Sequence, residues 1–275
     1  MNPHAAHPTS FGSLLSGLWS HRHLIAQMTR REIVGRYKGS VMGLLWSFLN
    51  PVLMLVIYTF VFSVVFKARW GGTDESRAQF AVILFAGMIV HALFSDILNR
   101  APTLILSNAN YVKKVVFPLE TLVAVAAGSA LFQAMASLIV LIAAMVVLQG
   151  DLPWTVVFVP VVLAPMLVLA MGLAWLIASL GVYLRDVGQV VAVLTTVLLF
   201  LSPVFFPVSA LPEFFQPWMR ANPLTFIIEQ TRSVLIFGHM PDWLHLGAYL
   251  IAASVVAWLG YLWFQKTRKG FADVL

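Results

Sequence analysis

The feature that most constrains this chain is a cluster of basic residues followed directly by a long apolar run. Four basic side chains lie within nine residues: Arg30, Arg31, Arg36 and Lys38. Residues 39–66 then contain no ionisable side chain except Tyr58. A membrane helix needs about 20 predominantly apolar residues, and basic residues beside it favour the cytoplasmic side. The stretch therefore predicts a transmembrane helix whose first end faces the cytoplasm.

The composition extends this prediction to the whole chain. Of its 275 residues, 60% are hydrophobic and only 10% are charged, with a mean hydropathy of +0.90. Soluble domains contain about 25% charged residues, so the sequence indicates an all-α integral membrane protein with one transmembrane domain over residues 1–275. There is no cysteine, which excludes disulfides, thiol catalysis and cysteine-bound zinc.

Apolar runs separated by polar or turn-forming residues predict six transmembrane helices. They cover approximately residues 41–66, 79–99, 119–148, 154–183, 187–206 and 243–264. Residues 11–30 predict an amphipathic helix at the membrane interface, and residues 101–118 predict a cytoplasmic helix between two spans. Five prolines between Ser202 and Pro223 exclude a continuous helix there. We therefore expect residues 207–241 to form a re-entrant or interfacial helical hairpin on the outer side.

The distribution of basic residues predicts the orientation of these helices. Of the 17 Lys and Arg residues, twelve fall in segments that this topology places in the cytoplasm and five in outer segments. Residues 1–40 contain no apolar run that resembles a signal peptide, so both termini are expected in the cytoplasm. Because the basic residues gather at helix ends, the net charge of +6 indicates membrane lipids as partners and not nucleic acid.

The motifs that would make the chain an enzyme are absent from the sequence. It has no G-x-x-x-x-G-K-[ST] loop for ATP, no H-E-x-x-H and no clustered metal ligands. We therefore expect no catalytic residue, metal or cofactor bound by this chain. Ionisable residues are scarce inside the spans, and His91 and Asp96 are the only candidates for a proton relay. The energy for transport is expected to come from another polypeptide.

Aromatic residues form the first candidate site. Tyr58, Phe62 and Phe66 lie at i, i+4 and i+8, on one face of the first span. Phe200 and Phe205 lie close to Pro203 in the proline-rich region and raise the same question. Such rings suit the apolar faces of sugars and a sliding chain, because they make few directional bonds. The alternative is that they face lipid or pack between helices.

The basic cluster Arg30, Arg31, Arg36 and Lys38 forms the second candidate site. Guanidinium and ammonium groups at this level could bind a lipid pyrophosphate or other headgroup. The alternative is that they only anchor the helix end at the cytoplasmic surface.

Five sequence blocks, in order, carry a resemblance to a known family: RYKGSVMGLLWSFLNP (36–51), KKVVFPLE (113–120), YLRDVGQV (183–190), SPVFFP (202–207) and NPLTFIIEQTR (222–232). The chain resembles the membrane subunit, or permease, of type-2 ABC exporters for bacterial polysaccharides, near the O-antigen branch. The resemblance covers nearly the whole chain.

The resemblance implies a fold, partners and residue roles. It implies an ABC-2 permease fold in the inner membrane, working as a homodimer with two copies of a separate nucleotide-binding subunit that binds ATP and Mg. The substrate would be a polysaccharide linked to undecaprenyl pyrophosphate, exported from the cytoplasm. Residues 11–30 and about 103–115 would contact the ATPase, the latter including Tyr111, Lys113 and Lys114. Residues 204–237 would form the external gate.

Several alternatives remain open at this stage. For the aromatic residues, the resemblance implies that Tyr58, Phe62, Phe66 and Phe205 line the translocation path of such an exporter. The cargo could instead be a teichoic acid or a capsular polysaccharide, or a drug or small lipid. A membrane-embedded glycosyl- or acyltransferase would need clustered acidic or histidine groups, and the sequence offers only dispersed ones. An ion-coupled carrier would need more ionisable residues inside the membrane.

Overall fold

The computed structural model describes residues 9–65, 77–113 and 117–275, and these residues form helices and turns without a strand. The all-α prediction is confirmed. The α-helices are α1 (Phe11–Ser20), α2 (Arg22–Arg36), α3 (Trp46–Tyr58), α4 (Arg77–Leu104), α5 (Ala109–Lys113), α6 (Thr121–Gln149), α7 (Val159–Tyr183), α8 (Val187–Phe200), α9 (Gln216–Ala221), α10 (Pro223–Leu235), α11 (Trp243–Thr267) and α12 (Phe271–Val274). The shorter helices are η1 (Gly43–Leu45), η2 (Thr59–Val65), η3 (Leu106–Asn108), η4 (Trp154–Phe158), η5 (Val208–Ala210) and η6 (Arg268–Gly270).

Five helical segments of the described residues are long and apolar enough to cross a bilayer. They are Gly43–Phe62, Gln79–Leu104, Thr121–Leu148, Trp154–Tyr183 and Trp243–Val274, and each falls on a predicted span. The predicted span 187–206 is instead the 14-residue helix α8, which ends at Phe200. A helix of that length extends about 21 Å, short of the ~30 Å hydrocarbon core. The sixth crossing therefore stays a prediction.

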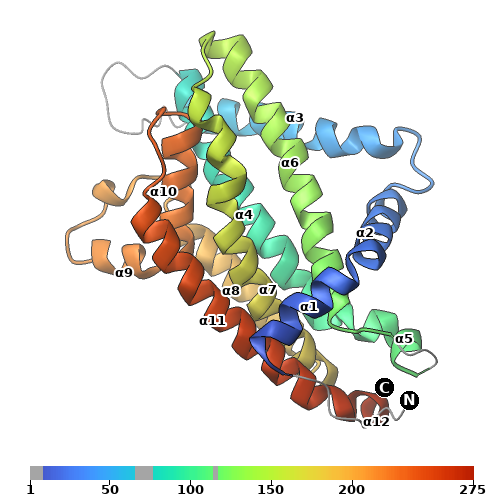
Figure 1. Cartoon of the computed structure of the whole chain (residues 1–275). Coiled ribbons are helices and arrows are strands. Elements are labelled where there is room, and N and C mark those ends of the chain that lie inside the picture. Colours follow the sequence, from blue (N-terminus) through green and yellow to red (C-terminus); the bar gives the residue numbers. More distant parts are fainter. Residues whose placement is uncertain (1–8, 66–76, 114–116) are drawn as a thin grey trace.

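Helix α4 forms the centre of the fold (Figure 1). Its membrane segment is 78% buried, and it packs against α6, α7, α8 and α10. Helix α11 packs along α7 on one side of this centre. The crossing is close because Gly172 of α7 and Gly260 of α11 meet there: a Cβ added at Gly172 would lie 2.5 Å from the Cα of Ala257. Small residues permit such contacts between membrane helices.

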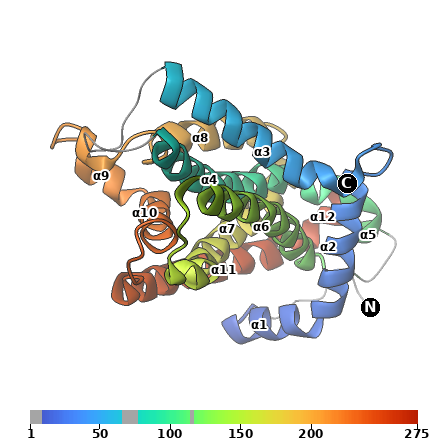
Figure 2. The same cartoon turned by 90° about the horizontal axis from the view of Figure 1, so that it is seen from above.

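Helix α3 is the least covered of the long apolar segments. Only 11% of Gly43–Phe62 is buried, and the helix leans across the bundle while α6 runs along it (Figures 1 and 2). Val56, Ile57 and Phe60 are among its exposed apolar side chains. The π-helix η2 extends α3 beyond Tyr58. The segment thus presents a long apolar side to lipid or to another subunit.

The predicted interfacial helix 11–30 consists of two helices, α1 and α2, that run in different directions (Figure 2). Ser10 caps α1 by accepting a hydrogen bond from the Ser13 amide at 3.1 Å. His21 separates the two helices, with its ring Nδ1 2.8 Å from the Gly17 carbonyl oxygen. Such side chain–backbone hydrogen bonds compete with helix continuation. Helices α1, α5 and α12 lie at the same end of the molecule (Figure 1).

The predicted cytoplasmic helix 101–118 is not one helix. Helix α4 continues to Leu104, and the short helices η3 and α5 follow. Asn108 Nδ2 donates to the Leu104 carbonyl at 2.9 Å, which favours a tight turn at this position. Beyond residues 114–116, Arg268 fixes the chain again by donating to the Glu120 carboxylate at 2.8 Å and to the Phe117 carbonyl at 2.7 Å.

The predicted outer hairpin is built from turns, η5, α9 and α10. Pro203 follows α8 closely and cannot supply a helical amide donor, which explains why α8 ends before the predicted residue 206. Asn222 joins the start of α10 to the end of α8, since its Oδ1 accepts from the Leu224 amide and its Nδ2 donates to the Leu201 carbonyl, each at 2.9 Å. Helix α10 packs against α4 and α7.

Candidate functional site

Four of the five predicted path aromatics lie together in a row, which we call the aromatic row. The ring centroids of Tyr58 and Phe62 are 6.4 Å apart, those of Phe62 and Phe205 are 5.5 Å apart, and those of Phe205 and Phe200 are 5.8 Å apart. The last two pairs are stacked. The row connects the α3–η2 segment with the end of α8 and the turn that follows it. Phe66 lies outside the described residues.

The row has a buried support and an open end. Phe80 of α4 is only 2% exposed, and its centroid lies 6.4 Å from that of Phe62. Phe200, in contrast, is 59% exposed. The sequence analysis did not identify Phe80, because no helical spacing relates it to the first span. Apart from the Tyr58 hydroxyl, such a surface offers ring faces without hydrogen-bond donors, so it can contact an apolar or sugar ring without fixing its position.

A buried arginine holds the turn that carries Phe205. Arg232 of α10 is 3% exposed and donates to three backbone carbonyls: Nε to Ile83 at 2.9 Å, Nη1 to Pro203 at 2.5 Å and Nη2 to Val204 at 3.0 Å. Burial lowers the pKa of Arg232 to about 9, and the charge of nearby Glu229 opposes this shift. Burial likewise raises the pKa of Glu229. The sequence gives no local signal for this role of Arg232, because its three acceptors lie in other segments of the chain.

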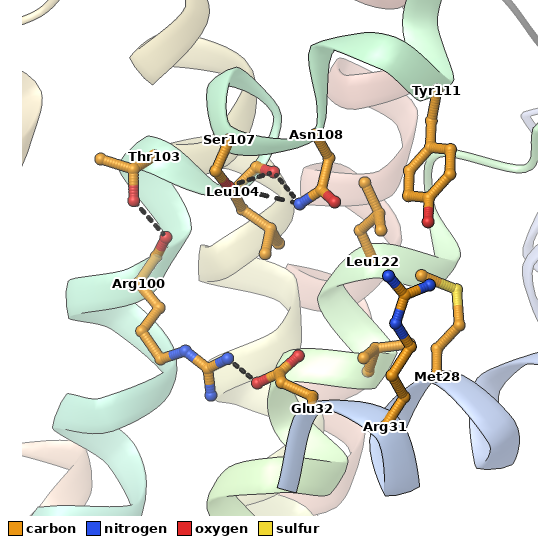
Figure 3. Close-up of a pocket in the computed structure, with 11 residues that line it drawn as sticks. Met28, Arg31, Glu32, Arg100, Thr103, Leu104, Ser107, Asn108, Tyr111 and Leu122 are labelled. Carbon is orange, nitrogen blue, oxygen red and sulfur yellow. Dashed lines mark hydrogen bonds and ion pairs between the residues drawn. The ribbon is translucent and has the colours of Figure 1, made fainter. Parts of the chain in front are cut away.

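At another part of the fold, α2, α4, η3, α5 and α6 line a partly open cavity of about 420 Å³ (Figure 3). Arg31 and Tyr111 extend into it from α2 and α5, and Arg100 lines it from α4. Tyr111 is stacked on Phe117, with centroids 4.5 Å apart and ring planes 14° apart. The cavity thus joins one predicted headgroup residue and one predicted ATPase-contact residue.

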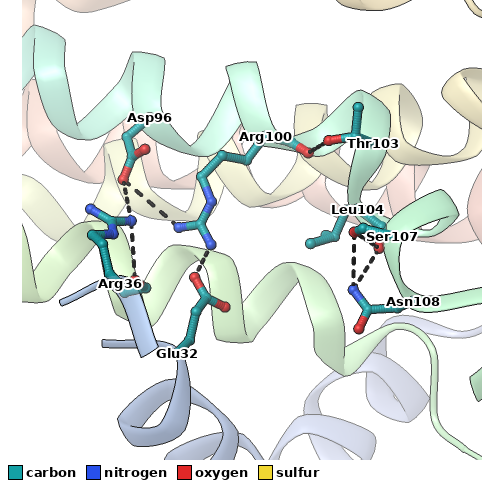
Figure 4. A network of polar contacts seen from close by, with 9 residues as sticks. Glu32, Arg36, Asp96, Arg100, Thr103, Leu104, Ser107 and Asn108 are labelled. Carbon is teal, nitrogen blue, oxygen red and sulfur yellow. Dashed lines mark hydrogen bonds and ion pairs between the residues drawn. The ribbon is translucent and has the colours of Figure 1, made fainter. Parts of the chain in front are cut away.

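Alternating charges connect α2 to α4 beside this cavity (Figure 4). Arg100 forms an ion pair with Glu32 and lies 3.8 Å from the Asp96 carboxylate. Asp96 is also 3.6 Å from Arg36, which reaches Ser129 of α6 at 3.4 Å. Glu32 and Arg36 are four residues apart on α2, as are Asp96 and Arg100 on α4, so each pair lies on one face of its helix.

Two further contacts continue this network toward α3. The Tyr37 hydroxyl donates to Gln133 Oε1 at 3.0 Å, and Gln133 Nε2 donates to the Ser47 carbonyl at 3.2 Å. The network therefore ties α2 to α4, to α6 and, through Gln133, to α3. His91 belongs to a separate contact, in which its Nε2 lies 2.9 Å from the Thr195 carbonyl. Asp96 and His91, the two candidates for a proton relay, thus both make contacts between helices in the structure.

The predicted basic cluster is divided among different surroundings. Arg31 lines the cavity of Figure 3, and Arg36 joins the charged network. Arg30, on another side of α2, lines a cavity with Thr29, Ile33 and Phe132, and Lys38 is exposed. Lys113 ends α5, and Lys114 lies outside the described residues. The four basic residues of the cluster therefore do not form one site.

In the part of the chain that the structure describes, no three His, Asp or Glu side chains approach closely enough to hold a metal ion. Near the cavity, Glu32, Arg36, Asp96 and Arg100 form ion pairs with one another, whereas Arg31 has no such partner among the described residues.

Comparison with known proteins identifies the class. Residues 23–236 match the family model described as "ABC-2 type transporter", and the chain belongs to this family. An O-antigen export system permease protein RfbA from Myxococcus xanthus is 28% identical over 94% of this chain and 98% of its own length. RfbA from Klebsiella pneumoniae is 23% identical over 92% and 95% of the two chains. The polysialic acid transport protein KpsM of Escherichia coli is 24% identical over 92% and 96%.

Family membership gives the chain its role. It is the membrane permease of an ABC transporter, and the ATP that drives such a transporter is hydrolysed on a separate subunit. The chain itself is not an enzyme, which removes the transferase alternative.

Proposed function

We propose that this permease exports a polysaccharide linked to undecaprenyl pyrophosphate, foremost the O-antigen of lipopolysaccharide, across the inner membrane. Similarity over nearly the whole chain to O-antigen export permeases supports the cargo class. The lipid carrier and the direction, from cytoplasm to periplasm, follow from the family resemblance.

The observation that carries this proposal is the aromatic row. It extends from Tyr58 to the exposed ring of Phe200 and joins two segments that are distant in sequence. A polymer that slides past a surface must not be held by strong directional bonds at each step. Stacked rings provide contact area with this property, whereas carboxylates or amides would bind each sugar in one position.

The working assembly that we propose contains two copies of this chain and two ATP-binding subunits. The uncovered apolar sides of α3 and α8, which include Val56, Ile57, Val193 and Val197, support contact with a second copy. Helices α1 and α5, at one end of the molecule, are the surfaces that would contact the ATPase. ATP and Mg would be bound by that partner. Both termini of the permease would face the cytoplasm.

A capsular polysaccharide is the second candidate cargo. KpsM and the capsule polysaccharide export inner-membrane protein CtrC of Neisseria meningitidis are relatives at 24% identity. A teichoic acid exporter is a further alternative from the sequence. Composition analysis of the polymer retained in a strain without this permease distinguishes the three.

Substitution at Phe62 tests the aromatic row. Phe62 contacts the rings of Tyr58, Phe80 and Phe205, so Phe62→Ala is expected to slow export several-fold. The matched control is Phe60→Ala, which removes an exposed ring of the same segment that is not part of the row. The measurement is surface polymer after induced expression, with co-purification of the ATPase to establish assembly. Equal export by the two assembled variants would contradict the role of the row.

A further inference from the structure

The cavity between α2, α4, α5 and α6 combines positive charge with unused hydrogen-bond donors. Among the described residues, neither the guanidinium of Arg31 nor the hydroxyl of Tyr111 has a hydrogen-bond or ion-pair partner, and both extend into the cavity (Figure 3). Arg100 also lines it, and its positive charge is shared between Glu32 and Asp96. Because Arg36 also pairs with Asp96, the network of Glu32, Asp96, Arg36 and Arg100 is neutral overall, and Arg31 supplies the positive charge of the cavity.

The shape and remaining walls limit what can bind there. A volume of about 420 Å³ is at the small end of ligand pockets and is too small for a polymer. Thr103 and Ser107 add hydroxyl oxygens, while Met28, Leu104 and Leu122 form apolar wall. A suitable ligand therefore has a compact anionic group joined to an apolar portion.

We propose that this cavity recognises a diphosphate group. Arginine binds phosphate through parallel, charge-assisted hydrogen bonds, and a phenolic hydroxyl adds a neutral donor. The stacking on Phe117 holds the Tyr111 ring in place. The inference rests on the proposed function insofar as the diphosphate belongs to the lipid-linked substrate. A free diphosphate has the same chemistry, and the experiment below separates the two sources.

Binding there has a mechanical consequence. A diphosphate beside Arg100 competes with the carboxylate of Glu32 for the same guanidinium. Exchange of one anion for the other releases one of the two ion pairs between α2 and α4, while Arg36 and Asp96 still form the other. Since α2 directly follows α1, the helix expected to contact the ATPase, arrival of the headgroup would be sensed where ATP hydrolysis is controlled.

The test measures binding of farnesyl diphosphate to the purified full-length permease in detergent, with farnesol as the probe that lacks phosphate. Arg31→Gln is expected to weaken binding about tenfold or more, because it removes the unpaired guanidinium. Arg30→Gln is the matched control: it removes the same charge from the adjacent residue, which lines a different cavity. Tyr111→Phe keeps the stack on Phe117 and is expected to weaken binding by a smaller factor.

Glu32→Gln distinguishes recognition from a merely structural role. It removes the competing carboxylate but keeps the shape of the side chain, so farnesyl diphosphate is expected to bind more tightly, by about threefold or more. Weaker binding by a Glu32→Gln protein that retains wild-type thermal stability would overturn the proposal. Equal effects of Arg30→Gln and Arg31→Gln, or equal binding of farnesol and farnesyl diphosphate, would also overturn it.

Inorganic pyrophosphate identifies the source of the group. If inorganic pyrophosphate competes as strongly as farnesyl diphosphate, and its competition depends on Arg31, the cavity binds a free diphosphate. If it competes only weakly, the cavity binds a lipid headgroup. Both results support diphosphate recognition. Export of polymer in cells is measured separately, so a binding failure with normal export overturns this inference alone. If the permease binds farnesyl diphosphate but deletion of its gene leaves export unchanged, the proposed function is overturned instead.

Discussion

A single arginine determines how the turn after α8 sits on the bundle. Arg232 supplies three of its N–H groups to carbonyls of α4 and of the turn, and it is buried among them. Gly87 leaves room for this guanidinium, since a Cβ at that position would lie 2.6 Å from Nη2. Because Phe205 follows Val204 directly, Arg232 positions one ring of the aromatic row through the backbone.

Replacement of Arg232 by lysine tests this geometry while keeping the charge. One ammonium cannot reach three carbonyls in different directions, so Arg232→Lys leaves buried acceptors without donors, at a cost of about 1–3 kcal/mol for each. We expect a marked drop in the melting temperature of the purified protein and reduced export. Arg220→Lys, at an exposed arginine of α9, is the control and should leave both unchanged. Wild-type stability of Arg232→Lys would show that the three contacts are dispensable.

At this scale the sequence predicted residue types better than residue partners. The aromatic residues were identified by spacing and by the family resemblance, and four of them meet in the structure. The contacts of Arg232 depend on positions 28, 29 and 149 residues away in the chain, which no local pattern contains. The equal four-residue spacing of Glu32–Arg36 and Asp96–Arg100 was a usable signal, and it was not recognised.

Among the elements, the α7–α11 pair depends most directly on small residues. The Cβ of an alanine at Gly260 would overlap the carbonyl oxygen of Gly172 on the facing helix. The two backbones can therefore approach only while both positions remain glycine. Helix α11 has a second glycine, Gly247, whose Cβ position has no atom within 4 Å.

These two glycines of α11 give a matched pair of substitutions. Gly260→Ala forces the helices apart and is expected to destabilise the protein by about 1–3 kcal/mol, the usual cost of overpacking. Gly247→Ala adds the same methyl group in open space and should be neutral or slightly stabilising, because alanine favours a helix over glycine. Thermal unfolding in detergent measures both. Similar melting temperatures for the two variants would contradict the close crossing.

Helix existence was predictable from hydropathy, whereas several helix ends were not. Long apolar runs locate α4, α6, α7 and α11 because a bilayer requires a minimum length of apolar helix. The break at His21, the turn at Asn108 and the early end of α8 arise from individual side chains and prolines. An averaged hydropathy does not reveal breaks that single residues cause. The predicted ranges 11–30, 101–118 and 187–206 therefore ran across these breaks.

On the scale of the whole molecule, the cavity and the aromatic row lie at different places on one connected framework. The charged network ties α2 to α4 and α6, and α4 also supports the row through Phe80. A movement of α2 caused by the ATPase would therefore reach the helix that backs the proposed path. In the proposed dimer, a second copy of the chain would complete the path along the uncovered sides of α3 and α8.

The central claim is that this permease exports a lipid-linked polysaccharide, and deletion of its gene tests it most directly. The measurement is extraction of the lipid-linked glycans, with glycan staining of each membrane leaflet and of the cell surface. The account predicts full-length polymer held on the cytoplasmic leaflet and none at the surface, with export restored by the intact gene. Normal surface polymer in the deletion strain, or the absence of any lipid-linked polymer, would contradict it.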